Sequence, residues 1–155
     1  MNEPAAYDDV AFPALLRAAR LTYRDAVRAA LAGAGFEDMP GNGSYVVGAI
    51  ARSEVPLAEV IGELGVSKQT AGQLVDTLVA RGYLDRRVDP DDRRRLTVSL
   101  TERGQAAAVA IRSGVEDVDA AIEARVGAEP VRQARIALGG LFELGSERRA
   151  AARDA

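Results

Sequence analysis

The sequence predicts a mainly helical chain that carries one small β-hairpin, and three observations support this prediction. Stretches on both sides of the centre repeat apolar residues every three or four positions, as amphipathic helices do. The central stretch 55–104 instead holds two short helical patterns joined by a tight turn, followed by two strand-like runs around an arginine-rich turn. The length of 155 residues is enough for one domain with its own core.

The composition excludes several classes of function. The chain has no Cys and no His, which removes disulfides, thiolate nucleophiles, imidazole-bound metals and His-based acid–base catalysis. No convergent set of catalytic groups is visible, so we predict no enzyme activity, no cofactor and no metal. No apolar run approaches the roughly 18 residues of a membrane span, and the acidic N-terminus lacks the order of a signal peptide. We therefore expect a cytoplasmic protein with no membrane partner.

The N-terminal part predicts one long helix and one short helix. An apolar stripe with steps of four and three runs through the stretch 10–31 and comprises Phe12, Leu16, Ala19, Tyr23, Val27 and Ala30. Glycines at 33 and 35 and the run Pro40-Gly-Asn-Gly end this helix and form a loop. The apolar run 44–51 has β-branched residues that also suit a strand, but its place before the central stretch favours a helix.

The run Leu64-Gly65-Val66-Ser67 indicates a tight turn between two helices. Pro56 suits the first turn of the first helix, Gly65 suits a left-handed cap at its end, and Ser67 can cap the second helix through its hydroxyl. The second helix is predicted over residues 68–81. Its buried face comprises Ala71, Leu74, Val75 and Leu78, and its exposed face comprises Lys68, Gln69, Gly72, Gln73 and Asp76. Taken alone, this turn favours a helix-turn-helix but also fits a plain helical hairpin in a core.

The residues that follow distinguish between these alternatives. Gly82 stops the helix, residues 83–88 and 95–100 are strand-like, and the polar cluster 89–92 forms a turn between them. A helix-turn-helix followed by such a hairpin, or wing, is a winged helix-turn-helix, which places one helix in the DNA major groove. The sequence therefore predicts a mainly α chain built around this DNA-binding module.

The charge distribution agrees with a local DNA contact. The net charge is −3 and the pI is about 5.1, yet residues 81–103 hold seven arginines against five acids. Binding depends on the field at the contact surface rather than on the total charge. Three arginines at the wing tip suit phosphates and a narrow minor groove, and Asp92 can orient Arg94. The alternative is a solvated charged turn, in which an ion pair stabilises little.

The C-terminal part predicts two more helices. Thr101 can cap the first, whose stripe comprises Ile111, Val115, Val118, Ile122 and Val126. Gly127 and Pro130 interrupt it, and a second stripe comprises Val131, Ala134, Leu138 and Leu141. These stripes and that of the first helix exceed what one small DNA-binding lobe can cover. We therefore predict an intertwined homodimer, with a monomeric helical bundle as the alternative.

With these residues placed, the chain resembles the MarR (multiple-antibiotic-resistance regulator) family. The resemblance covers residues 10–144 and is dense from 57 to 104, in LAEVIGELGVSKQTAGQLVDTLVARGYLDRR, DPDDRR and LTVSLTERG. It implies a transcriptional regulator, acting as a repressor, that binds a pseudo-palindromic double-stranded DNA operator as a homodimer. The single chain 1–155 would comprise a helical dimerisation frame, 10–34 and 102–150, and a winged helix-turn-helix lobe, 44–101.

The resemblance also implies the DNA-binding residues. Those matching the recognition helix are Ser67, Lys68, Gln69, Thr70 and Gln73. Gln suits bidentate hydrogen bonds to adenine, whereas Ser, Thr and Lys suit phosphates or mixed contacts. Those matching the wing and its base are Asp92, Arg94 as the minor-groove arginine, Arg93 as its helper, and Arg86 and Arg87 near the DNA backbone.

A small aromatic or phenolic ligand that releases DNA is implied as well. The family's cleft between frame and lobe would involve Tyr23, Tyr45 and Ile111, although these residue types at helical spacing more often belong to a core than to a ligand-binding wall. Sensing of peroxides through Cys or of metals through His and Cys does not carry over, because this chain has neither residue.

Winged helices also serve only protein–protein contact or dimerisation, as in some small-molecule methyltransferases. This chain lacks a Gly-rich strand–loop–helix for a nucleotide cofactor and has no room for a catalytic domain. An interaction surface should carry apolar anchors where the chain has Lys68, Gln69 and Gln73. DNA binding is therefore favoured over a role in protein–protein contact alone.

We predict that Arg94→Ala weakens operator binding strongly without affecting the fold, because the variant removes the minor-groove cation. Affinity for operator DNA and thermal stability are to be measured side by side. An unchanged affinity with normal stability would contradict this role of Arg94.

Overall fold

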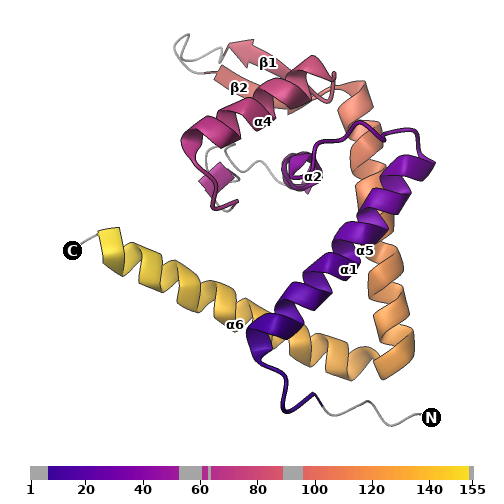
Figure 1. Ribbon diagram of the computed structural model, residues 1–155, viewed down its shortest axis with the longest axis vertical. Coiled ribbons are helices and arrows are strands. Elements are labelled where there is room, and N and C mark those ends of the chain that lie inside the picture. The colour runs from indigo at the N-terminus through magenta and orange to yellow at the C-terminus, as the bar shows by residue number, and fades with distance from the viewer. Residues whose placement is uncertain (1–6, 53–60, 63, 89–95, 154–155) are drawn as a thin grey trace. The chain divides into compact units, whose positions relative to one another are not determined.

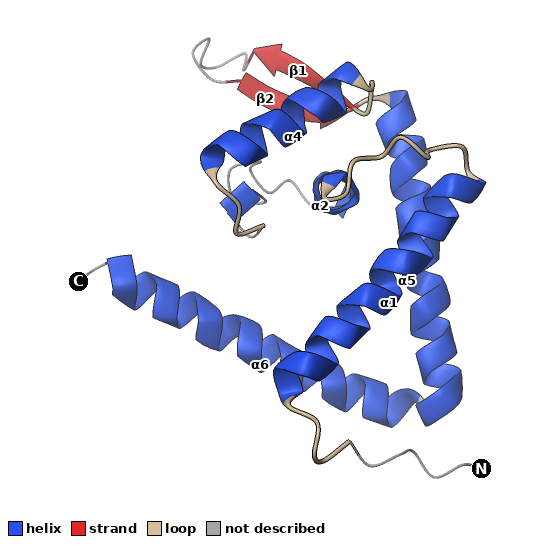
Figure 2. Cartoon of the chain, in the orientation of Figure 1, coloured by secondary structure: helices blue, strands red, loops and turns tan. Residues whose placement is uncertain are grey.

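The computed structural model describes residues 7–52, 61–62, 64–88 and 96–153. In these ranges it confirms the predicted mainly helical chain with one small hairpin (Figures 1 and 2). The elements are α1 (Phe12–Gly33), α2 (Gly43–Arg52), α4 (Lys68–Ala80), β1 (Leu84–Val88), β2 (Leu96–Leu100), α5 (Glu102–Val126) and α6 (Ala128–Arg153).

The described residues form two compact units. The central unit comprises Phe12–Asp117 and therefore includes α1, α2, α4, both strands and most of α5. The terminal unit comprises the described parts of 1–11 and 118–155, with the end of α5 and all of α6. The division into a dimerisation frame and a DNA-binding lobe remains a prediction.

The predicted N-terminal helix and the short helix after it are confirmed as α1 and α2. Gly35, with φ at +82°, turns the chain after α1. The apolar stripe of α1 is buried only in its second half, where Val27 and Leu31 lie in the core, whereas Phe12 near its start is 50% exposed. The prediction that residues 44–51 are helical is confirmed, and Val46 and Val47 are fully buried there.

The turn before α4 has the predicted chemistry. Gly65 has φ at +64°, the left-handed conformation that a glycine cap adopts. The predicted helix that begins at Pro56 lies mostly outside the described residues. The two of its residues that are described as helical are Ile61 and Gly62. Gly82, with φ at +74°, ends α4 as predicted.

The two strands pair antiparallel, with Leu84 opposite Leu100 and Val88 opposite Leu96. The turn between them, residues 89–95, lies outside the described residues. Leu84 is buried, so the base of the hairpin is anchored in the core. The wing therefore starts from a fixed point beside the end of α4.

The core of the central unit lies between the second half of α1, α2, α4, β1 and the first half of α5. It comprises Val27, Leu31, Val46, Val47, Leu78, Tyr83, Leu84, Ala107, Ala108, Ala110 and Ile111. At Gly114 of α5 an added Cβ would lie 2.8 Å from the Cα of Val27, so α1 and α5 cross in close backbone contact. Small residues on α5 permit this approach.

The two C-terminal helices also form as predicted. The backbone N–H of Gly104 donates to the Thr101 hydroxyl at 2.9 Å, which confirms the predicted cap of α5. Gly127, with φ at +89°, separates α5 from α6, and Pro130 lies in the first turn of α6. No helix in the described ranges is long and apolar enough to cross a membrane.

Candidate nucleic-acid interface

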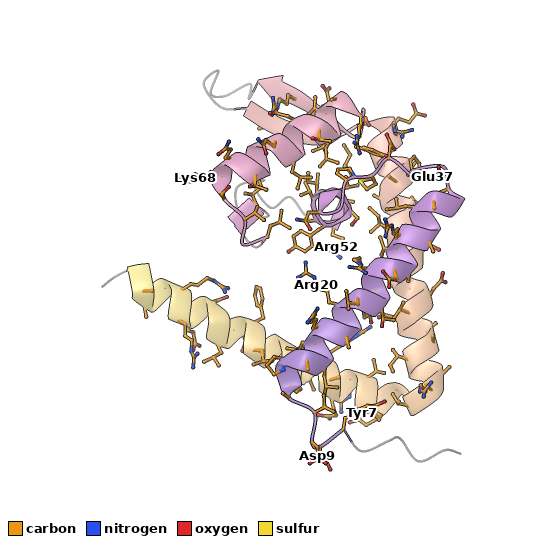
Figure 3. The ribbon with its side chains drawn as sticks, viewed as in Figure 1. Tyr7, Asp9, Arg20, Glu37, Arg52 and Lys68 are labelled. Atoms are coloured by element: carbon orange, nitrogen blue, oxygen red, sulfur yellow. The ribbon has the colours of Figure 1, made fainter. Side chains whose placement is uncertain are left out.

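Helix α4 divides into a buried apolar face and an exposed polar face. Ala71, Val75 and Leu78 are 4% exposed or less, and Leu74 is half-buried. The exposed residues are those predicted, namely Lys68, Gln69, Thr70, Gly72, Gln73 and Asp76. Figure 3 labels Lys68 at the beginning of α4, where its side chain projects outward. The helix therefore presents a row of hydrogen-bonding groups to an external partner.

Ser67 holds the first turn of α4 in place. Its Oγ accepts a hydrogen bond from the backbone N–H of Thr70 at 3.1 Å, and the two hydroxyl oxygens lie 2.9 Å apart. Such an N-cap satisfies one of the unpaired N–H groups at a helix start. Ser67 and Thr70 therefore act first as a pair that orients the beginning of the polar face.

The hairpin is joined to α4 by an ion pair between Arg86 of β1 and Asp76. Both side chains are exposed, so the pair stabilises the fold little but fixes the direction of the guanidinium. Arg87 lies opposite Thr97 in the strand register. Asp92, Arg93 and Arg94 lie outside the described residues. The DNA contacts of Arg86, Arg87 and the three wing-tip residues remain predictions.

A polar cluster that no sequence pattern predicted lies at the base of the wing, and we call it the Asp38–Tyr83–Arg103 cluster. The Tyr83 hydroxyl donates to Asp38 Oδ1, and Arg103 Nη2 donates to the same oxygen at 2.9 Å and to the Tyr83 oxygen at 3.1 Å. Arg103 Cζ lies 4.7 Å from the centroid of the Tyr83 ring and 5.3 Å from that of Phe36. The guanidinium is thus bound by a carboxylate and by two aromatic faces.

These contacts shift the protonation equilibria in opposite directions. The hydrogen bond from Tyr83, with further help from the Arg103 guanidinium, lowers the pKa of Asp38 against the opposing effect of burial. Burial, and then the hydrogen bond to Asp38, raise the pKa of the Tyr83 phenol. At neutral pH the cluster therefore holds an ionised carboxylate and a protonated phenol, which is the pairing that its hydrogen bonds require.

The start of α5 is joined to the start of β1 at the same place. The backbone N–H of Thr101 donates to the carbonyl oxygen of Tyr83 at 3.1 Å, and the Thr101 hydroxyl reaches the same oxygen at 3.2 Å. A Cβ added at Gly104 would lie 2.1 Å from that oxygen. Only glycine at position 104 lets the first turn of α5 approach this closely.

A cavity of about 520 Å³ lies between the second half of α1, the following loop and the start of α2. Its lining residues are Arg24, Val27, Arg28, Leu31, Ala32, Phe36, Glu37, Met39, Pro40, Gly41 and Ser44. The predicted ligand residues Tyr23, Tyr45 and Ile111 do not line it. Ile111 is in the core, Tyr23 is half-buried and Tyr45 is 39% exposed. Among the described residues, no group of three or more His, Cys, Asp or Glu could hold a metal ion.

A serine-capped helix with an exposed polar face, followed by an antiparallel hairpin joined to that helix, defines a winged helix-turn-helix protein. Residues 37–95 match the sequence profile of the MarR family. No curated protein sequence matches the chain.

Solved structures of MarR-family proteins share the fold over most of the chain. A MarR-family transcriptional regulator from a Rhodococcus species is 25% identical, with a TM-score of 0.65 over 90% of this chain and 97% of that one. MepR from S. aureus, solved as a DNA complex, is 17% identical, with a TM-score of 0.68 over 86% and 97%. Residues 37–95 are therefore similar in sequence to the MarR family, and the chain shares the fold of solved MarR-family transcriptional regulators.

Proposed function

We propose that this protein is a sequence-specific DNA-binding repressor without enzyme activity, which binds a pseudo-palindromic operator as a homodimer. The observation that carries the proposal is the exposed polar face of α4, which begins at a serine cap and lacks large apolar residues. A protein-binding surface would place apolar or aromatic anchors on such a face. That MepR, with a similar fold, was solved with DNA supports the same partner.

Within this proposal, the residues of α4 and of the hairpin have different roles. Gln69 and Gln73 contact base edges in the major groove, and Lys68 contacts phosphate. Ser67 and Thr70 contribute hydroxyls at the helix start beside the DNA backbone. The backbone and minor-groove contacts of the wing come from Arg86, Arg87, Arg93 and Arg94, and Asp92 orients the Arg94 guanidinium.

The proposed homodimer rests on apolar side chains that the single chain leaves uncovered. In α6, Phe142 is 62% exposed and Leu138 and Leu141 are each 43% exposed, all on one helical stripe. In the first half of α1, Phe12 is 50% exposed. An uncovered stripe of this kind marks an interface in a water-soluble assembly, and a second copy of the chain is the partner that pseudo-palindromic DNA requires.

We further propose that a small aromatic or phenolic ligand releases the DNA. Tyr23, Tyr45 and Ile111 are candidates from the sequence alone. The cavity beside Phe36 and Met39 offers a second location, and its volume is within the range of about 300–1,000 Å³ that is usual for ligand pockets.

A titration of the purified protein against DNA from upstream of its own gene, at several salt concentrations, tests the proposal. We expect binding that survives excess competitor DNA and a log affinity that falls linearly with log salt. If the affinity for this upstream DNA equals that for random DNA, selection of bound sequences from a randomised pool shows whether the protein recognises an operator located elsewhere. Failure to enrich any sequence would leave the winged helix as a protein-contact module.

Gln73→Ala is expected to lower operator affinity by about 10-fold and to relax sequence preference at one position of each half-site, because a bidentate base contact is lost. The exposed Lys68 on the same helix provides a matched control. Lys68→Ala should instead weaken binding to all sequences alike and reduce the salt slope by about one phosphate contact. A uniform loss in the Gln73 variant would show that Gln73 does not read bases.

A further inference from the structure

The loop between α1 and α2 has two faces with different contacts. On one face Phe36, Glu37, Met39 and Pro40 line the cavity. On the other face Asp38 accepts hydrogen bonds from Tyr83 and Arg103. Phe36 contributes to both faces, because it lines the cavity and its ring centroid lies 6.1 Å from that of Tyr83 in an edge-to-face arrangement. One short segment thus separates the cavity from the base of the wing.

The same loop contacts α4 in two places. The Arg81 guanidinium, at the C-terminal end of α4, donates to the backbone carbonyl oxygen of Asp38. Around Gly43, a Cβ would lie 2.7 Å from Pro40 Cγ, 2.9 Å from Met39 Sδ and 3.0 Å from Leu78 Cδ2. The cavity wall and the buried face of α4 therefore meet at one crowded point. Because packed interiors resist compression, a shift of the wall must move these neighbours.

Arg103 joins the loop to α5 and to the start of β1. Its guanidinium bonds Asp38, contacts the Phe36 ring and covers the Tyr83 ring. The Arg103–Asp38 pair is nevertheless exposed, with side-chain exposures of 41% and 46%. Exposed pairs of this kind stabilise a fold little, so a small displacement of the loop is enough to break this one.

We propose that the loop Phe36–Pro40 couples occupancy of the cavity to the positions of α4 and β1, and that Arg103 is the positioning residue that transmits this coupling. The inference rests on the proposed function, because it names how DNA binding is regulated. Displacing Phe36 or Met39 moves Asp38, which lies between them in the chain, and this releases Arg103 and Tyr83. A ligand that binds the cavity better in the displaced state then lowers operator affinity.

A double-mutant cycle tests the coupling without an identified ligand. Ala32 of α1 lines the cavity and is exposed, so Ala32→Phe places a ring in the cavity against the loop. We expect this variant to lower operator affinity by at least about 5-fold. In an Arg103→Met background, which keeps an apolar stem without the charge, the same substitution should change affinity by less than about 2-fold. Arg103→Lys, which retains a cation for Asp38, should restore most of the coupling.

Ala29→Phe is the matched control, because Ala29 is an exposed residue of α1 that does not line the cavity. It should leave operator affinity unchanged. Thermal unfolding of every variant separates coupling from loss of fold, and Ala32→Leu replaces Ala32→Phe if the larger ring prevents folding. Equal losses for Ala32→Phe with and without Arg103 would overturn the proposal.

Amide hydrogen exchange provides a readout that does not depend on DNA. The backbone N–H of Tyr83 donates to the carbonyl oxygen of Leu78, and the backbone N–H of Thr101 donates to the carbonyl oxygen of Tyr83. Ala32→Phe should accelerate exchange at both amides, and Ala29→Phe should not. If the wild-type protein binds no operator, the proposed function fails while this measurement still decides the coupling. Unchanged exchange in Ala32→Phe would overturn it.

Discussion

Gly104→Ala is expected to lower the free energy of unfolding by about 3 kcal/mol or more. The added Cβ would lie 2.1 Å from the carbonyl oxygen of Tyr83 and 3.1 Å from its carbonyl carbon. These are backbone atoms, so no side-chain rotation relieves the clash. The first turn of α5 must then move away from β1, which breaks the hydrogen bonds from Thr101 to Tyr83.

Thermal unfolding at one fixed protein concentration measures this effect, because association with a second copy changes the apparent stability. A loss of this size lowers Tm by at least about 6 °C in a chain of this length. Gly72→Ala is the matched control, because its Cβ meets nothing within 4 Å on the exposed face of α4. It should raise stability by up to about 1 kcal/mol, since alanine favours helix over glycine. A Tm of Gly104→Ala equal to wild type would contradict the close approach of α5 and β1.

Phe142→Asp is expected to dissociate the proposed homodimer and to lower operator affinity by about 100-fold. Phe142 is the most exposed large apolar residue of α6, at 62%. A carboxylate there would have to be buried without a partner in the dimer interface, which is strongly unfavourable. A monomer reaches only one half-site and loses the advantage of holding two recognition helices on one DNA.

Light scattering after size-exclusion chromatography measures the mass, and a titration with operator DNA measures the affinity. Gly140→Asp introduces the same charge on the opposite side of α6, where a Cβ meets nothing within 4 Å. This control should remain dimeric and bind operator normally. A dimeric Phe142→Asp would show that the stripe of α6 is not the interface. A monomeric variant with full affinity would separate dimerisation from operator binding.

The local structure of this chain follows from short sequence signals. Gly65 takes the left-handed conformation and Ser67 caps α4, because these effects depend on the residue and its immediate neighbours. The division of α4 into buried and exposed faces follows from helical periodicity in the same way. The polar face proposed to read DNA could therefore be predicted residue by residue. The contacts of the wing tip, at Asp92, Arg93 and Arg94, remain predictions because they fall outside the described residues.

Periodicity predicted which residues of α1 share a stripe but not which of them are covered. Val27 and Leu31 are buried, whereas Phe12 and Leu16 on the same helix are exposed. The difference depends on where α2 and α5 pack along α1. Gly114 permits that position, because its missing side chain allows contact with the backbone at Val27. A glycine within a helical sequence does not indicate which other helix will pack against it.

By itself, the sequence determined the helices, the caps, the hairpin and the polar face of α4, because each depends on residues a few positions apart. Only the tertiary structure decided the Asp38–Tyr83–Arg103 cluster, the cavity beside its loop and the approach of Gly104 to Tyr83. Asp38 and Tyr83 are 45 positions apart, and Asp38 and Arg103 are 65 apart. Side chains so distant in sequence come into contact only when the packing of the whole unit brings the loop after α1, the start of β1 and the start of α5 together. No local sequence pattern predicts that contact.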